Sequence, residues 1–148
     1  MPFLFRLSPL LMLALFSSLG CGGAPADVGA VTGLVTLDNA PLASALVEFH
    51  SLDSADVGIA RTGDDGRFTM MYVRDVQGAK VGKYRVRITT YVPGNNEVDP
   101  PLPPKPERLP SKYTGQDSEL EAEVKPGEND FTFPLDSNGE VVQPVEET

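Results

Sequence analysis

Thr62-Gly63-Asp64-Asp65-Gly66-Arg67-Phe68 stands between two runs in which apolar side chains alternate with other residues. The first run covers residues 57–61, with Val57 and Ile59 in phase, and the second covers residues 67–73. Asp-Gly favours a tight hairpin because glycine adopts a positive φ without a steric clash. A period of two gives a strand one buried and one solvated face. The pattern therefore predicts two antiparallel strands that meet at this turn.

Five further segments show the same alternation and are separated by short polar or Pro/Gly-containing connections. They are residues 28–37, 45–50, 83–91, 119–124 and 131–135. Several short half-buried strands with frequent turns are typical of a two-layer sandwich. The sequence thus predicts an all-β protein, a seven-stranded antiparallel Greek-key β-sandwich over residues 28–136.

Three segments are expected to lie outside the strands. Residues 74–81 contain Gly78 and are expected to form a loop. Residues 92–110 carry six prolines between Pro100 and Pro110, which favours an extended, non-helical connection between sheets. A recognition peptide for an aromatic groove is the alternative for this proline-rich part. Residues 137–148 are acidic and poor in apolar side chains, which predicts a disordered tail.

The first twenty residues have the composition of an export signal. Arg6 precedes an apolar stretch over residues 7–19, which is short for a membrane span. The stretch ends in Ser18-Leu19-Gly20-Cys21-Gly22-Gly23, which resembles the bacterial lipobox. This resemblance implies cleavage between Gly20 and Cys21 and acylation of Cys21, followed by a flexible tether over residues 21–27. An ordinary signal peptide with an incidental cysteine is the alternative.

Acylation would place the protein at a bacterial cell envelope. Several acyl chains, at roughly 0.8 kcal/mol per buried methylene, give a lasting membrane anchor. The residue after Cys21 is Gly22. In the lipoproteins that this segment resembles, an aspartate at that position retains the protein at the inner membrane, so the glycine implies the outer membrane.

Four motifs of the expected domain, taken in order, resemble the carboxypeptidase regulatory-like domain. They are Val31 to Phe49, with Pro41-Leu42 at its centre; the turn at residues 62–68; Gly82-Lys83-Tyr84-Arg85-Val86; and Gly127 to Phe133. Small bacterial lipoproteins with this domain also carry a segment similar to Pro110-Ser111-Lys112-Tyr113. The resemblance implies a transthyretin-like sandwich that serves as a non-catalytic module. It assigns no catalytic residue.

Composition narrows the classes of partner. The 148 residues include 12 Lys and Arg against 21 Asp and Glu, a net charge of −9. A chain without a basic stripe long enough to displace counterions is a poor ligand for nucleic acids. Cys21 is the single cysteine, so neither an internal disulfide nor a thiolate metal site is expected.

The polar side chains suggest no enzyme. His50 is the single histidine, no Gly-x-Ser-x-Gly motif accompanies it, and we interpret it as an exposed strand residue. Asp53, Asp56, Asp64 and Asp65 offer carboxylates of the kind that calcium prefers, but their spacing matches no calcium loop. Turn formation explains Asp64 and Asp65. We therefore expect no catalytic residues, no metal and no cofactor.

Two surface features bear on binding. Lys83, Arg85 and Arg87 form a basic stripe, which an acidic stripe of Glu119, Glu121 and Glu123 on an adjacent strand would match. Tyr91 and Tyr113 are the main candidates for exposed aromatic contacts. The resulting hypothesis is a lipid-anchored envelope module that binds a protein or polysaccharide partner. Its alternative is a glycan- or small-ligand-binding module at the cell surface.

Overall fold

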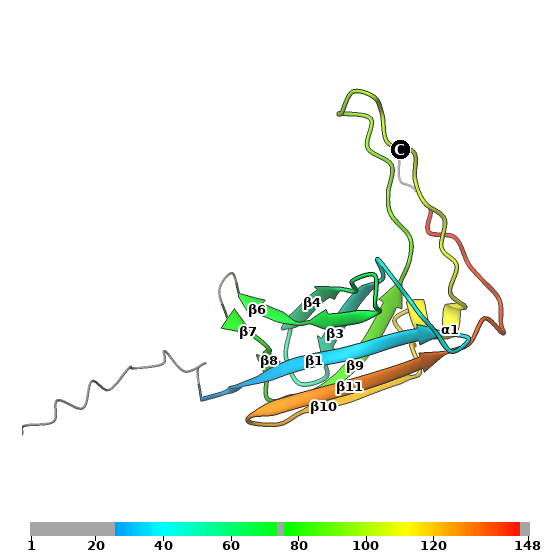
Figure 1. Cartoon of the computed structure of the whole chain (residues 1–148). Helices are drawn as coiled ribbons and strands as arrows, with labels where there is room; N and C mark the ends of the chain where they lie inside the picture. Colours follow the sequence, from blue (N-terminus) through cyan, green and yellow to red (C-terminus); the bar gives the residue numbers. More distant parts are fainter. Residues whose placement is uncertain (1–25, 74–75, 146–148) are drawn as a thin grey trace, which may run out of the picture.

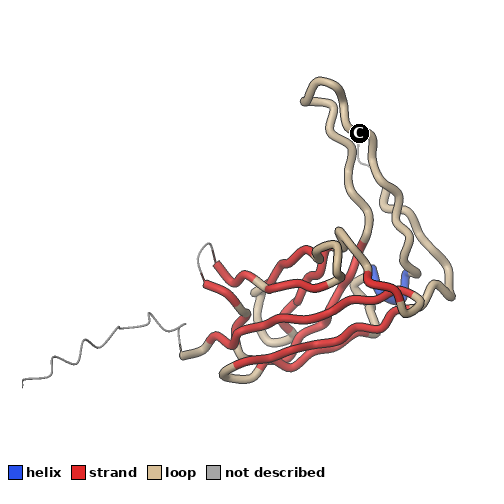
Figure 2. Tube along the Cα trace, in the orientation of Figure 1, coloured by secondary structure: helices blue, strands red, loops and turns tan. Residues whose placement is uncertain are grey.

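A computed structural model describes residues 26–73 and 76–145. The expected signal peptide, residues 1–20, lies outside the described residues, and so do Cys21 and most of the expected tether. The all-β class is confirmed, because two sheets face each other and form a sandwich (Figures 1 and 2).

The first sheet is built around β1 (Val28–Leu37), which lies between β11 (Glu128–Leu135) and β2 (Ala40–Pro41). β5 (Arg67–Thr69) and β8 (Ala79–Lys80) also pair with β1. The second sheet has the order β10-β9-β3-β4-β6-β7. Its strands are β3 (Leu46–Ser51), β4 (Val57–Arg61), β6 (Met71–Val73), β7 (Val76–Gln77), β9 (Gly82–Thr89) and β10 (Leu120–Val124).

The prediction of wholly antiparallel sheets is wrong for one pair of strands. β1 and β11 are parallel, with Ala30 opposite Glu128 and Leu37 opposite Leu135. β10 runs towards the end of the sandwich at which β1 begins, and the following turn passes the chain to the other sheet. Both β1 and β11 therefore start at the same end. We call it the tether end, and the opposite end the arm end.

The turn at residues 62–68 forms as predicted, but it joins the two sheets. Gly66 has φ of 74° and donates its N–H to Gly63 O at 3.0 Å, and Asp65 Oδ1 accepts the N–H of Arg67 at 3.0 Å. The two strands beside the turn do not pair with each other: β4 pairs with β3 and β6, and β5 pairs with β1. The predicted hairpin turn therefore carries the chain from the second sheet to the first.

The predicted strand over residues 67–73 is divided at Met70. The buried Met70 donates its N–H to Val31 O at 2.9 Å in the first sheet. The next residue, Met71, pairs with Ile59 in the second sheet. Alternation predicted the buried residues here, but it does not specify which sheet receives each half of the strand. The expected loop at 74–81 likewise contains β7 and β8, each only two residues long.

Aromatic side chains from both sheets fill the centre of the sandwich. Phe49, fully buried on β3, contacts one aromatic ring of its own sheet and three of the facing sheet. Gly33 on β1 leaves room for them, because a Cβ there would lie 2.6 Å from the Phe68 ring. Since interiors are packed to crystal-like density, this close approach requires glycine.

A long arm, residues 92–105, projects from the arm end of the sandwich (Figures 1 and 2). Its two sides pair antiparallel, Val92 with Lys105 and Asn95 with Leu102. The arm is extended, as its prolines predicted. Its two sides also pair with each other, so the chain leaves the sandwich and returns to it. It is followed by a single helical turn, α1 (Ser111–Thr114), which alternation did not predict.

Residues 137–145, the described part of the expected tail, form no helix or strand but make hydrogen bonds to the preceding chain. Ser111 donates its N–H to Glu140 O at 2.8 Å. The Gln143 side chain accepts the Glu107 N–H at 2.8 Å and donates to Glu107 O at 3.0 Å. These hydrogen bonds hold a segment that contributes little apolar area to the core.

Asp136, at the start of this segment, is clamped to α1. Lys112 Nζ lies 3.0 Å from both carboxylate oxygens, and the Tyr113 hydroxyl donates to Oδ2 at 2.9 Å. The ammonium contact, the hydroxyl and the Asn138 N–H lower the pKa of Asp136 from 3.8 to about 2. The same contact with Asp136 raises the pKa of Lys112.

The clamp predicts a defined acid dependence. Because the pKa of Asp136 is lower in the folded chain than in the unfolded chain, its stabilising contribution is complete above pH 3.8 and is lost as the pH falls towards about 2. The stability difference between the wild type and Asp136→Asn should therefore shrink over that window. NMR titration of the Asp136 carboxyl carbon should give a midpoint near 2, and a midpoint at 3.8 would contradict the clamp.

Candidate functional site

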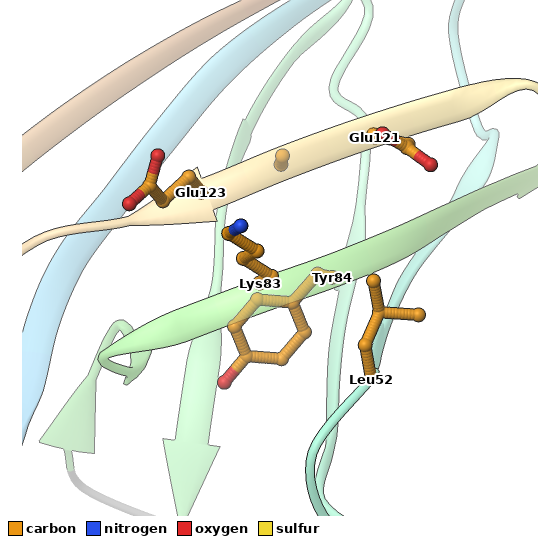
Figure 3. Close-up of a pocket in the computed structure, with 6 residues that line it drawn as sticks. Leu52, Lys83, Tyr84, Glu121 and Glu123 are labelled. Carbon is orange, nitrogen blue, oxygen red and sulfur yellow. The ribbon is translucent and has the colours of Figure 1, made fainter.

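The basic stripe lies beside an acidic strand, as predicted. Glu121 and Glu123 on β10 stand opposite Arg85 and Lys83 on β9. Figure 3 shows a pocket beside these two strands, with Lys83 reaching towards β10, which carries both glutamates. Arg85 Nη2 lies 3.3 Å from Glu121 Oε1. Glu119 precedes β10 in the chain and is not part of that strand.

Backbone carbonyls of the connection between α1 and β10 hold the two arginines. Arg85 Nη1 donates to Ser118 O at 3.1 Å, and Arg87 Nε donates to Thr114 O at 3.1 Å. Both side chains are about two-thirds covered, with exposed fractions of 32% and 28%. These two residues of the basic stripe are therefore held by backbone carbonyls, and Arg85 is held by the acidic strand as well.

His50 lies on β3 directly opposite Arg85 on β9. It was expected to be an exposed strand residue, but its Nε2 is buried and has no hydrogen-bond partner among the described residues. Glu48, two positions earlier on the same face, approaches Nε2 to 3.7 Å, beyond hydrogen-bond distance. Arg85 Nε is the other buried side-chain nitrogen without a partner in the described chain.

His50 and Arg85 line a cavity of about 310 Å³ on the outer face of the second sheet. Its lining comes from the end of β3, from β9 and from the loop after α1: His50, Ser51, Leu52, Arg85, Arg87 and Gln116. The sequence singled out the histidine and the arginines separately. It did not indicate Ser51 or Gln116, because their contribution depends on strand register and on a loop more than sixty residues away along the chain.

Two of the four aspartates weighed for calcium, Asp56 and Asp65, serve in local structure. Asp56 accepts hydrogen bonds from Ser54 Oγ at 2.7 Å and Lys80 Nζ at 3.0 Å, and these two contacts lower its pKa. Asp65 holds the turn after β4. Within residues 26–73 and 76–145, no three His, Cys, Asp or Glu side chains gather in a way that would hold a metal ion.

The two candidate tyrosines differ in exposure. Tyr113 is 3% exposed and directs its hydroxyl to Asp136, so its assignment as an exposed aromatic is wrong. Its burial follows from α1, which turns the ring onto the core. Tyr91 is half-buried at the base of the arm, where it lines a cavity of about 230 Å³ with Pro104, Pro106, Gln143 and Pro144.

In the part of the chain that the structure describes, no helix has the length and apolar character needed to cross a bilayer. Comparison of the sequence and fold with protein-family models, with curated proteins and with solved structures finds no significant match.

Proposed function

We propose that this protein is a lipid-anchored, non-catalytic module of a bacterial cell envelope that presents its arm to a protein partner. The observation that carries the proposal is the separation of the two ends of the sandwich. β1 begins at the tether end, next to the expected lipidation site at Cys21, and the arm leaves the arm end (Figure 1). An anchor on one end would direct the arm away from the membrane.

The length of the tether supports this arrangement. Between Cys21 and Val28 lie six residues, which span at most roughly 20 Å when fully extended. β1 adds ten residues, or about 33 Å, along the sandwich. The tether end would then remain near the lipid headgroups, and the arm would stand beyond the full length of the sandwich.

Exposed apolar side chains at the tether end also fit a nearby membrane. Leu52, Val57, Val73 and Val81 are between 40% and 52% exposed. They flank three connections at the end where β1 starts: β3 to β4, β6 to β7 and β8 to β9. The hydrogen bond from Val81 N to Asp27 O illustrates this. Scattered apolar residues need no explanation, but their concentration at one end favours an apolar neighbour.

The arm has the properties of a presented recognition segment. It is stiffened by prolines and by its own antiparallel pairing, which lowers the entropy lost when a partner binds. Val98 and Leu102 near its tip are 40% and 56% exposed, and they offer apolar contacts to a partner. This arrangement favours the recognition role that the proline-rich segment left open.

Cys21→Ala tests the anchor directly. Cells given labelled palmitate should incorporate it into the wild-type protein and not into Cys21→Ala, which should also leave the membrane fraction. Gly22→Ala is the matched control, since it keeps the acceptor thiol and should retain the label. A wild-type protein without label would refute the anchor.

A second candidate function is binding of a small ligand. The observation that favours it is the cavity beside His50, where polar side chains converge on about 310 Å³.

A further inference from the structure

The cavity between β3, β9 and the loop after α1 presents hydrogen-bond donors and no carboxylate. Arg85 and Arg87 contribute guanidinium groups, and Gln116 contributes an amide. Ser51 Oγ accepts the N–H groups of Asp53 and Ser54. The single hydroxyl proton of Ser54 goes to Asp56, so the 3.0 Å contact between the two serine hydroxyls uses the Ser51 proton, and Ser51 offers the cavity no free donor.

Two buried side-chain nitrogens without a hydrogen-bond partner in the described part of the chain belong to neighbouring residues at this cavity. Buried side-chain polar atoms in folded proteins nearly always have a partner, and one without a partner costs about 1–3 kcal/mol. In the described chain the two exceptions, His50 Nε2 and Arg85 Nε, belong to residues that face each other across the β3–β9 ladder. Both residues line this cavity.

The guanidinium groups are held in position before any ligand arrives. Ser118 O and Thr114 O fix Arg85 and Arg87 without cancelling their charge. Binding usually loses free energy because flexible side chains become ordered. Here the two arginine side chains are already ordered in the folded protein. The planar guanidinium groups suit the two oxygens of a carboxylate.

Two neighbouring glutamates limit the charge that the cavity accepts. Glu48 Oε2 lies 3.9 Å from Arg87 Nε, and Glu121 Oε1 lies 3.3 Å from Arg85 Nη2. Glu121 is 66% exposed and therefore screened by water, whereas Glu48 is 20% exposed. The field is positive near the arginines but weak overall, which favours a monoanion over a phosphate dianion. The volume matches a small molecule.

From these observations we propose that the cavity binds the carboxylate group of a small organic acid, either free or as part of a uronic acid residue. Arg85 and Arg87 hold the carboxylate, and Gln116 hydrogen-bonds to the rest of the ligand. The site lies on the folded sandwich, so it does not depend on the lipid anchor. The palmitate experiment and the binding experiment therefore fail independently.

Titration of the full-length protein in detergent micelles tests the site, with arginine Nε–H and backbone amide NMR signals as the readout. Glucuronate should shift the Arg85 and Arg87 signals saturably, and glucose, its uncharged counterpart, should not. Arg85→Lys keeps the charge and removes the Nε–H, and should weaken glucuronate binding about tenfold. Gln116→Ala, a substitution at an exposed loop residue, should weaken it about threefold.

Arg61→Lys is the matched control, because Arg61 is exposed on β4 and donates to Ser44 O outside the cavity. It should bind glucuronate as the wild type does. Equal shifts with glucose, tighter binding of inorganic phosphate than of glucuronate, or unchanged affinity in both Arg85→Lys and Gln116→Ala would each overturn the proposal.

Discussion

Phe49→Ala should lower the free energy of unfolding by about 3–5 kcal/mol, the range found when a buried Phe is truncated. Phe49 is fully buried, and its ring lies 5.6 Å from Phe131 and 5.7 Å from Tyr84 between ring centroids. Phe68 and Phe133 lie at 6.4 Å and 6.2 Å in edge-to-face geometry. Removal of the ring leaves a cavity between rigid sheets that cannot collapse to fill it.

Urea unfolding followed by far-UV circular dichroism measures this loss. Ile59→Ala is the matched control, because Ile59 lies on the neighbouring strand with its side chain on the outer face, 50% exposed. It should change the free energy of unfolding by less than about 1 kcal/mol. Similar losses in the two variants would mean that Phe49 is not the centre of the core.

The location of the strands could be predicted from the sequence because the period of two depends on burial alone. Val47 and Phe49 alternate with half-buried neighbours on β3, as a strand with one buried face must. The direction of pairing carries no such signal, since a strand has the same alternation beside a parallel or an antiparallel neighbour. For that reason the parallel pairing of β1 with β11 was missed.

The candidate cavity was predictable only in part, for a similar reason. Arg85 and Arg87 stood out as a charged stripe, and the match with Glu121 and Glu123 placed β10 beside β9 correctly. The burial of His50 Nε2 and the approach of Gln116 depend on three-dimensional register, which no local pattern encodes.

Glu107 was missed altogether, although it is the most fully hydrogen-bonded carboxylate in the described chain. It lies in the proline-rich run, where no alternation marks a buried position. An acidic residue two positions before the buried pair Leu109 and Pro110 was the available signal. The structure shows it 4% exposed at the base of the arm.

Glu107→Ala should cost about 3 kcal/mol and release the arm. Its Oε1 accepts the Thr90 hydroxyl at 2.6 Å and the N–H groups of Thr90, Arg108 and Leu109 at 2.9–3.0 Å. Its Oε2 accepts the Tyr91 N–H at 3.2 Å. Alanine would leave the buried N–H groups of Thr90 and Leu109 without a partner, at about 1–3 kcal/mol each.

Two measurements separate the stability effect from the position of the arm. Urea unfolding should show the loss in Glu107→Ala, and limited proteolysis should show faster cleavage within residues 92–105 under native conditions. Glu107→Gln should lie between the variant and the wild type, because its amide keeps one acceptor oxygen and turns a donor towards the remaining N–H groups.

Glu97→Ala is the control for a carboxylate on the arm itself, since Glu97 is exposed and its removal should change stability by less than about 0.5 kcal/mol. If Glu107→Ala matched that control in both measurements, the carboxylate would not hold the arm.

A rigid base matters for the proposed function because an arm that moves freely loses more entropy on binding. Loss of the Glu107 contacts should therefore weaken capture of the partner without affecting the anchor at Cys21.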